Sequence, residues 1–245
     1  MAVDAGFLDQ LVQLRSRGDQ TLGDLAFGHA LWSPKLGDED QRLKRFLQAG
    51  ATAYADSIFY SAIGDTERCI HALERAVEIS PNYAPAVLSL GSVEYQRNRK
   101  AKGRRLLLSL VSVVDDAPDG PEIIDAAGDF LIQRGEYADG LELYRAAVQR
   151  FPDLGVFHQG RGCCAAHEGE FREAVAASRR ALAIEPDNQK FVNDLGWCLA
   201  ESGALQEALA TLERAVAMDP ADALAQENLR LCNLKISKRR RKKAG

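Results

Sequence analysis

The residues best suited to chemistry in this sequence are two histidines and two cysteines that lie close together: His158, Cys163, Cys164 and His167. Cys163 and His167 are four residues apart, so on a helix they would share a face and could bind one metal ion. A structural zinc site needs four ligands, however, and the sequence places no clear fourth. Burial of the thiols as small apolar side chains is the simpler interpretation, and we predict no metal and no cofactor.

Two pairs of side chains could also support catalysis. Cys163 with His167 could form a nucleophile–base dyad, and Asp125 with Asp129 could act as acid and base. Neither pair comes with a pattern that would build an oxyanion site, and carboxylates at this spacing are common on solvated helix faces. The nucleotide-binding patterns GxGxxG and GxxxxGK[ST] do not occur. The sequence therefore predicts a protein that is not an enzyme.

The composition favours helices as the elements that carry these residues. The chain is 46% hydrophobic and 27% charged, which is enough apolar material for a core, while aromatic residues make up only 7%. Five cysteines, an odd number, argue against a disulfide framework. No apolar run is long enough to span a bilayer, and the first residues do not resemble a signal peptide. These features predict a cytoplasmic protein without a membrane span.

A period of 34 residues organises the sequence. One set of prolines ends helix-like segments, one set of glycines lies inside the preceding helices, and a second set lies at the turns. In that order, the three sets are Pro152, Pro186 and Pro220; Gly128, Gly162 and Gly196; and Gly135, Gly169 and Gly203. Three markers in one register across three units indicate a true repeat.

This pattern resembles the tetratricopeptide repeat, a helix–turn–helix unit of 34 residues. Five units are predicted, at about 50–83, 84–118, 121–154, 155–188 and 189–222. The family's usual aromatic residue at the fourth position is absent from all of them. The resemblance implies an all-α fold, an α-solenoid in which stacked helix–turn–helix repeats wind into a right-handed superhelix with a concave groove.

The segments outside the clearest repeats are interpreted from the same pattern. Residues 1–49 are predicted to form an N-terminal helical cap or a degenerate repeat, 223–236 a C-terminal capping helix, and 237–245 a basic disordered tail. The second unit has Asn98 where the others have a turn glycine, and the insert at 115–122 predicts a longer turn before the third unit, with a domain boundary as the alternative.

In this family, ligands usually lie in the concave groove lined by the first helix of each repeat. The corresponding positions read apolar near the N-terminal end, acidic in the middle and mixed near the C-terminal end. They are Tyr54 and Ile58; Leu88, Ser92 and Tyr95; Glu122, Asp125 and Asp129; Gln159, Cys163 and His167; and Lys190, Asn193 and Trp197. We therefore predict a partner segment with an apolar anchor and one or two Lys or Arg residues.

Some members of the family grip a C-terminal carboxylate with a clamp of lysines, asparagines and an arginine. None of these residue types stands at the corresponding positions in either of two registers. The positions hold Tyr54, Ile58, Ser89, Glu122 and Ala126, or Leu88, Ser92, Ala126, Val156 and Gly160. A heat-shock co-chaperone role that depends on this clamp is therefore not supported, although a broader chaperone-like role in holding peptides stays open.

The predicted function is that of a non-catalytic scaffold or adaptor that binds a peptide or helix of another protein. An alternative is an adaptor whose basic segments recruit nucleic acid or another anionic surface. These segments are a run over residues 97–105 and a tail. The tail comprises Lys238, Arg239, Arg240, Arg241, Lys242 and Lys243. A tail that only aids solubility is the plain reading, and self-association through exposed end helices also stays open.

Overall fold

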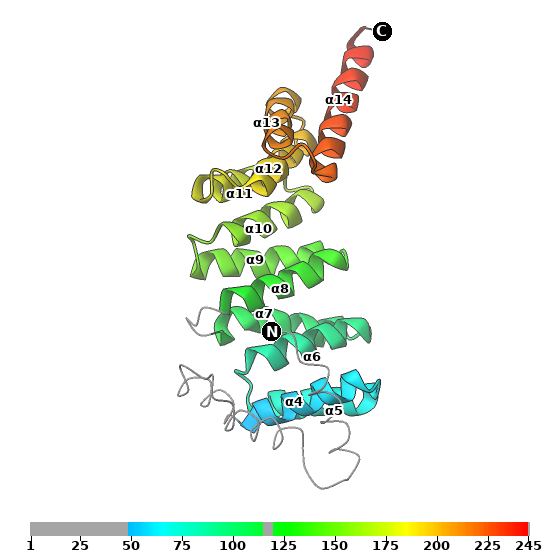
Figure 1. Ribbon diagram of the computed structural model, residues 1–245, viewed down its shortest axis with the longest axis vertical. Helices are drawn as coiled ribbons and strands as arrows, with labels where there is room; N and C mark the ends of the chain where they lie inside the picture. The colour runs from blue at the N-terminus through cyan, green and yellow to red at the C-terminus, as the bar shows by residue number, and fades with distance from the viewer. Residues whose placement is uncertain (1–48, 115–119, 245) are drawn as a thin grey trace. The chain divides into compact units, whose positions relative to one another are not determined.

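The computed structural model describes residues 49–114 and 120–244. Within these ranges the chain forms eleven helices and no strand (Figure 1). The predicted all-α solenoid is confirmed. The predicted N-terminal cap lies outside the described residues except for Ala49, and so does most of the 115–122 insert. None of the described helices is both long enough and apolar enough to cross a membrane.

The helices follow one another as antiparallel pairs joined by short turns, and α14 follows the last pair. The pairs are α4 (Ala49–Ala62) with α5 (Thr66–Ile79), α6 (Ala84–Gln96) with α7 (Lys100–Val113), α8 (Gly120–Gln133) with α9 (Tyr137–Arg150), α10 (Gly155–His167) with α11 (Phe171–Ile184), and α12 (Gln189–Glu201) with α13 (Leu205–Met218); α14 spans Ala223–Ala244.

The chain divides into two compact units, Met1–Ile123 and Ile124–Gly245, so that the division falls near the start of α8. In the first unit, α4 packs on α5, α5 on α6, and α6 on α7. In the second unit, each helix from α9 to α14 packs on the next, and the first helices α10, α12 and α14 also contact one another in order. Each unit therefore buries its apolar faces by stacking neighbouring pairs.

Four of the turns inside the pairs use a glycine in the left-handed region of backbone space. The φ angles are 74° at Gly64, 72° at Gly135, 78° at Gly169 and 85° at Gly203, and the turn of the second pair has Asn98 at 59°. Glycine adopts this conformation without steric cost, and asparagine tolerates it better than most residues. Asn98 thus replaces the turn glycine without changing the turn.

The turn at Asn98 gives a first testable prediction. Asn98→Ala should lower the free energy of unfolding by about 1 kcal/mol, because alanine pays the left-handed penalty without the local hydrogen bonding of asparagine. Asn98→Gly should leave it within about 0.5 kcal/mol of the parent. Urea unfolding followed by circular dichroism checks both; equal effects of the two substitutions would contradict this account.

Small residues set the distance between paired helices. A Cβ added at Gly196 would lie 2.6 Å from Leu212 Cγ, and one added at Gly91 would lie 2.5 Å from Leu107 Cδ2. The second helices contribute fully buried alanines at the repeat spacing, Ala147, Ala181 and Ala215. Close approach at these positions lets the larger neighbouring side chains fill the remaining space.

The C-terminal end differs from the sequence-based expectation. The capping helix was predicted to end at 236 and residues 237–245 to be disordered, but α14 continues to Ala244. Lysine and arginine are good helix formers, and their charges are favourable near a helix C-terminus. Ser237 stands 34 residues after the turn glycine Gly203, so the residue that would favour a turn is missing. Arg239 Nη1 also donates to Gly203 O at 3.2 Å.

Candidate protein-interaction surface

Successive first helices present the same face beside one another, and hydrogen bonds join them at a repeating offset of 35 residues. Gln159 Nε2 on α10 donates to Asp194 Oδ2 on α12 at 2.8 Å. Asn228 Nδ2 on α14 donates to Asn193 Oδ1 on α12 at 3.1 Å. In the second unit, α10, α12 and α14 therefore form one surface, which we call the first-helix face.

Aromatic side chains gather where this face meets the start of α9. The Tyr137 and His167 rings stack with their centroids 3.9 Å apart and their planes 4° apart. His167 lies next to Trp197 in turn, with ring centroids 5.1 Å apart. Burial lowers the pKa of His167, although Glu201 and Glu168 oppose this shift. His167 and Trp197, two of the predicted groove residues, are thus brought together.

A hollow of about 170 Å³ opens between α12 and α14, and we call it the α12–α14 pocket. Its lining residues are Trp197, Ala200 and Glu201 from α12, and Asn228, Leu231, Cys232, Leu234, Lys235 and Lys238 from α14. Leu231 and Leu234 are 41% and 43% exposed. The sequence analysis placed Trp197 on this surface but missed the α14 residues, because α14 was interpreted only as a cap. Leu231 follows Trp197 by one repeat length, which is the signal that could have found it.

The predicted acidic segment is only partly available. Tyr144 Oη donates to Asp125 Oδ1 at 3.1 Å, and burial, then the nearby charge of Asp129, raises the pKa of Asp125. Asp129 is exposed on α8, in the position equivalent to Cys163 and Trp197. Glu122 is also exposed, but it belongs to the first unit. In the second unit, Asp129 is therefore the acidic side chain best placed to meet a partner.

Two predicted groove residues are buried. Tyr95 is 1% exposed, and its ring packs where a Cβ on Gly103 would lie. Asn193 is 2% exposed and accepts the hydrogen bond from Asn228. Both side chains point into the packing between helices, so neither is available to a ligand.

The other predicted residues of the first unit have mixed exposure. Ile58 is 49% exposed, whereas Leu88 and Ser92 are half-buried, and Ser92 Oγ donates to Leu88 O. Tyr54 makes an edge contact with Tyr83, and its hydroxyl lies 3.4 Å from Ser89 Oγ. In the second unit, Lys190 is exposed near the start of α12 and Gln159 is half-buried.

The cysteines do not have the properties of nucleophiles. Burial raises the pKa of Cys163 and of Cys164 to about 12, and nearby acidic groups add to the shift. Both thiols are therefore protonated at neutral pH. All five cysteines are free, and the described part of the chain has no cluster of three or more His, Cys, Asp or Glu able to hold a metal ion.

The basic run over residues 97–105 is largely engaged within the first unit. Lys102 Nζ lies 3.0 Å from both Glu74 Oε1 and Glu94 Oε1. Arg97 and Arg99 lie within 3.9 Å of the same Glu94 carboxylate, which is fully buried. These cations neutralise a buried charge that would otherwise be costly. The run therefore offers less free positive charge than its sequence implies.

The basic residues of α14 lie on both sides of the helix. Arg239 and Arg240 line a second hollow, of about 460 Å³, together with Ile236 and residues 203–207. Lys238 lines the α12–α14 pocket instead. The positive charge at this end is consequently held on an ordered helix next to both hollows.

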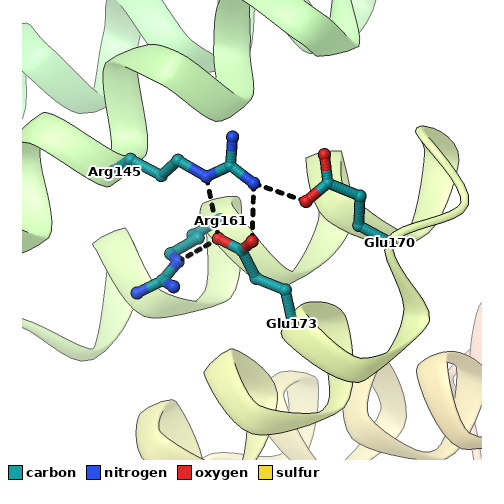
Figure 2. A network of polar contacts seen from close by, with 4 residues as sticks. All are labelled: Arg145, Arg161, Glu170 and Glu173. Atoms are coloured by element: carbon teal, nitrogen blue, oxygen red, sulfur yellow. Dashed lines mark hydrogen bonds and ion pairs between the residues drawn. The ribbon is translucent and has the colours of Figure 1, made fainter.

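A charged network joins α9, α10 and α11 (Figure 2). Arg145 on α9 donates to Glu173 Oε1 and Oε2 at 2.9 and 2.6 Å and to Glu170 at 2.5 Å. Arg161 on α10 donates to the same Glu173 carboxylate at 2.7 Å. These bonds lower the pKa of Glu173 to about 2. The network therefore ties together the helices that position the first-helix face.

Comparison with known proteins agrees with this architecture. Sequence models of the tetratricopeptide repeat family match residues 165–231 and 57–83. Similar solved structures include YrrB, described as a TPR protein with an unusual peptide-binding site. The two chains are 16% identical over 77% of this chain and 95% of that one, with a TM-score of 0.53.

Two further structures share the fold. Yeast Tom70 is 14% identical over 96% of this chain and 47% of its own, with a TM-score of 0.51. MamA 41-end from Desulfovibrio magneticus RS-1 is 12% identical over 71% and 97%, with a TM-score of 0.51. The fold and the surface define an α-solenoid of helix–turn–helix repeats. The chain contains tetratricopeptide repeats over the matched residues 165–231 and 57–83, as the 34-residue pattern indicated.

Proposed function

We propose that this protein is an interaction scaffold whose first-helix face, on α10, α12 and α14, binds a segment of a partner protein. The observation that carries the proposal is the α12–α14 pocket, where Trp197, Leu231 and Leu234 offer apolar surface to solvent. Interfaces typically use a few such anchors surrounded by polar contacts. The peptide-binding site ascribed to YrrB, a structure of the same fold, is consistent with this role.

The size of the pocket favours a peptide side chain over a small molecule. Ligand pockets are usually about 300–1,000 Å³, whereas this one is about 170 Å³. It is lined on one side by a half-buried aromatic ring and on the other by leucines. Polar groups such as Asn228 lie beside it and can hydrogen-bond to a peptide backbone.

The alternative, in which basic segments recruit nucleic acid, is supported only at α14. The run over 97–105 is engaged with Glu94 and Glu74, while Arg240, Arg241 and Lys242 are exposed. Binding of this kind would fall steeply with salt and would need the C-terminal half of α14. A cytoplasmic location belongs to the main proposal, because five free thiols suit a reducing compartment.

The test is selection of peptide ligands on the intact chain, followed by measurement of their affinities for variants. Trp197→Ala should weaken the selected peptides about tenfold, since it removes an anchor of about 1.4 kcal/mol. Phe171→Ala, which removes an aromatic side chain of 36% exposure from the second helix α11, is the matched control and should have no effect. Peptides that bind Trp197→Ala as tightly as the parent would exclude the first-helix face.

A further inference from the structure

We propose that the α12–α14 pocket takes one bulky apolar side chain from a partner segment whose neighbouring side chains are acidic. This rests on the proposed function and specifies the chemistry of the partner. It also reverses the charge that the sequence alone suggested, because Glu122, Asp125 and Asp129 had pointed to a partner with basic residues. The contacts of the pocket itself argue for the opposite charge.

The apolar part of the recognition comes from side chains that are partly exposed at the pocket. Trp197 and Leu231 occupy equivalent positions in successive first helices, and Leu234 lies one turn after Leu231 on the same side of α14. Leu224, near the start of α14, is also exposed, at 60%, but it does not line the pocket. Burying Leu231 and Leu234 under an aliphatic or aromatic side chain would remove about 25 cal/mol of unfavourable hydration per Å².

The charged part comes from lysines at the rim. Lys235 Nζ lies 2.5 Å from Glu201 Oε1, so these two pocket-lining charges compensate each other. Lys238 lines the same pocket and forms no ion pair with any residue that the structure describes. Arg241 and Lys242 follow it by three and four residues, which places them along the same side of α14. The rim therefore presents uncompensated positive charge.

Apart from Glu201, which pairs with Lys235, no carboxylate of the described residues lines the α12–α14 pocket. Asp129 is on α8, two first helices before α12, and Asp125 beside it is held by Tyr144. Asp194 is half-buried, its partial desolvation raises the pKa of its carboxyl, and it accepts a hydrogen bond from Gln159. A basic partner segment seated at the pocket would thus meet Lys238 before it met a free carboxylate. Charge complementarity favours acidic neighbours around the anchor.

The pocket contains its own reporter. Trp197 and Trp32 are the two tryptophans of the chain, so Trp32→Phe leaves Trp197 as the sole source of tryptophan emission. The probes are short fluorescein-labelled peptides with one central leucine flanked by glutamates, the same peptide flanked by lysines, and the glutamate peptide with alanine for leucine. Binding is followed by Trp197 emission and by peptide anisotropy in the full-length chain.

The expected order of affinity is clear. The glutamate-flanked leucine peptide should bind about tenfold more tightly than either of the other two, and added salt should weaken it. Lys238→Glu should weaken that peptide at least about fivefold and reduce the preference over the lysine peptide. Arg172→Glu on the second helix α11 makes the same change in net charge at an exposed site and should leave both affinities unaltered.

Each contrary result has a defined meaning. No saturable change of Trp197 emission with the glutamate peptide, or tighter binding of the lysine peptide, overturns the proposal. If the lysine peptide binds more tightly and its binding is weakened by Trp197→Ala, the scaffold function is still supported. A further contrary result is a single-stranded oligonucleotide of equal charge that binds more tightly than the glutamate peptide and loses its binding in Lys238→Glu. That result would show that the pocket is a nucleic-acid site and not a peptide site. Selected peptides that ignore Trp197 would remove the scaffold face and the pocket assignment together.

Discussion

Replacing Gly160 with alanine is expected to lower the free energy of unfolding by about 2–3 kcal/mol. A Cβ at this position would lie 2.2 Å from Tyr144 Cζ and within 2.6 Å of two more ring atoms. The ring cannot retreat, because a Cβ at Gly128 would also lie 2.2 Å from Tyr144 Cζ. Alanine gains about 1 kcal/mol in helix propensity over glycine, but overpacking a rigid, fully buried ring outweighs this gain.

The measurement is urea unfolding followed by circular dichroism, combined with a rescue. In the Tyr144→Leu background, a smaller and more flexible side chain faces Gly160, so the added methyl group should cost less than about 1 kcal/mol. The difference between the two backgrounds is the coupling between residues 160 and 144. If Gly160→Ala is equally destabilising with leucine at 144, the close contact with the ring is not the cause.

The repeat markers predicted the turns well because they report local backbone requirements. Gly64, Gly135, Gly169 and Gly203 all adopt left-handed φ angles at the ends of first helices, and Asn98 does the same. Glycine and asparagine tolerate a left-handed φ angle, so the sequence alone predicts where such turns lie. The direction of a side chain cannot be predicted in this way, because a shift of one position turns it by about 100° around the helix.

That rotation explains the errors at Tyr95 and Asn193. Both were assigned to the groove from their place in the repeat, and both face the packing between helices instead. The length of α14 differs from the prediction for another reason: a run of basic residues favours a solvated tail, but nothing in it stops a helix. The α14 residues that line the α12–α14 pocket were therefore not predicted. The pocket therefore required the structure.

The sequence also carries charge pairs that recur at the repeat period. Arg145 pairs with Glu173, and Arg179 pairs with Glu207, and both pairs are separated by 28 residues. Each member of the second pair follows its counterpart by one repeat length. Opposite charges that recur at the period of a repeat point to contacts between successive second helices.

Removing the first of these carboxylates is the other large effect that we expect. Glu173→Gln should lower the free energy of unfolding at pH 7 by about 2 kcal/mol. A fall of the Glu173 pKa from 4.5 to about 2 corresponds to about 3 kcal/mol, and the partial exposure of Arg145 and Arg161, 41% and 31%, reduces that contribution. The glutamine keeps the shape of the side chain but lacks the charge that both arginines hold (Figure 2).

The effect should depend on pH in one direction. Because the pKa of Glu173 is lower in the folded protein than in the unfolded chain, its contribution is fully present above about pH 4.5. It is lost progressively as the pH falls toward 2, where the folded carboxylate also becomes protonated. The difference in stability between the parent and Glu173→Gln should therefore shrink as the pH is lowered from 7 to 3.

Glu207→Gln provides the matched control for this pH series. Glu207 pairs with Arg179 at 2.6 Å across the equivalent helices, but the two side chains are 52% and 55% exposed. A single exposed pair is screened by solvent and costs entropy to order, so its removal should have a much smaller effect than removal of Glu173. Two results would show that the Glu173 carboxylate does not hold these helices together. One is a difference in the free energy of unfolding between the parent and Glu173→Gln that stays constant from pH 7 to 3. The other is an equal loss of stability in Glu207→Gln. Glu173 is 18% exposed and receives two guanidinium groups, whereas Glu207 is 52% exposed and pairs with Arg179.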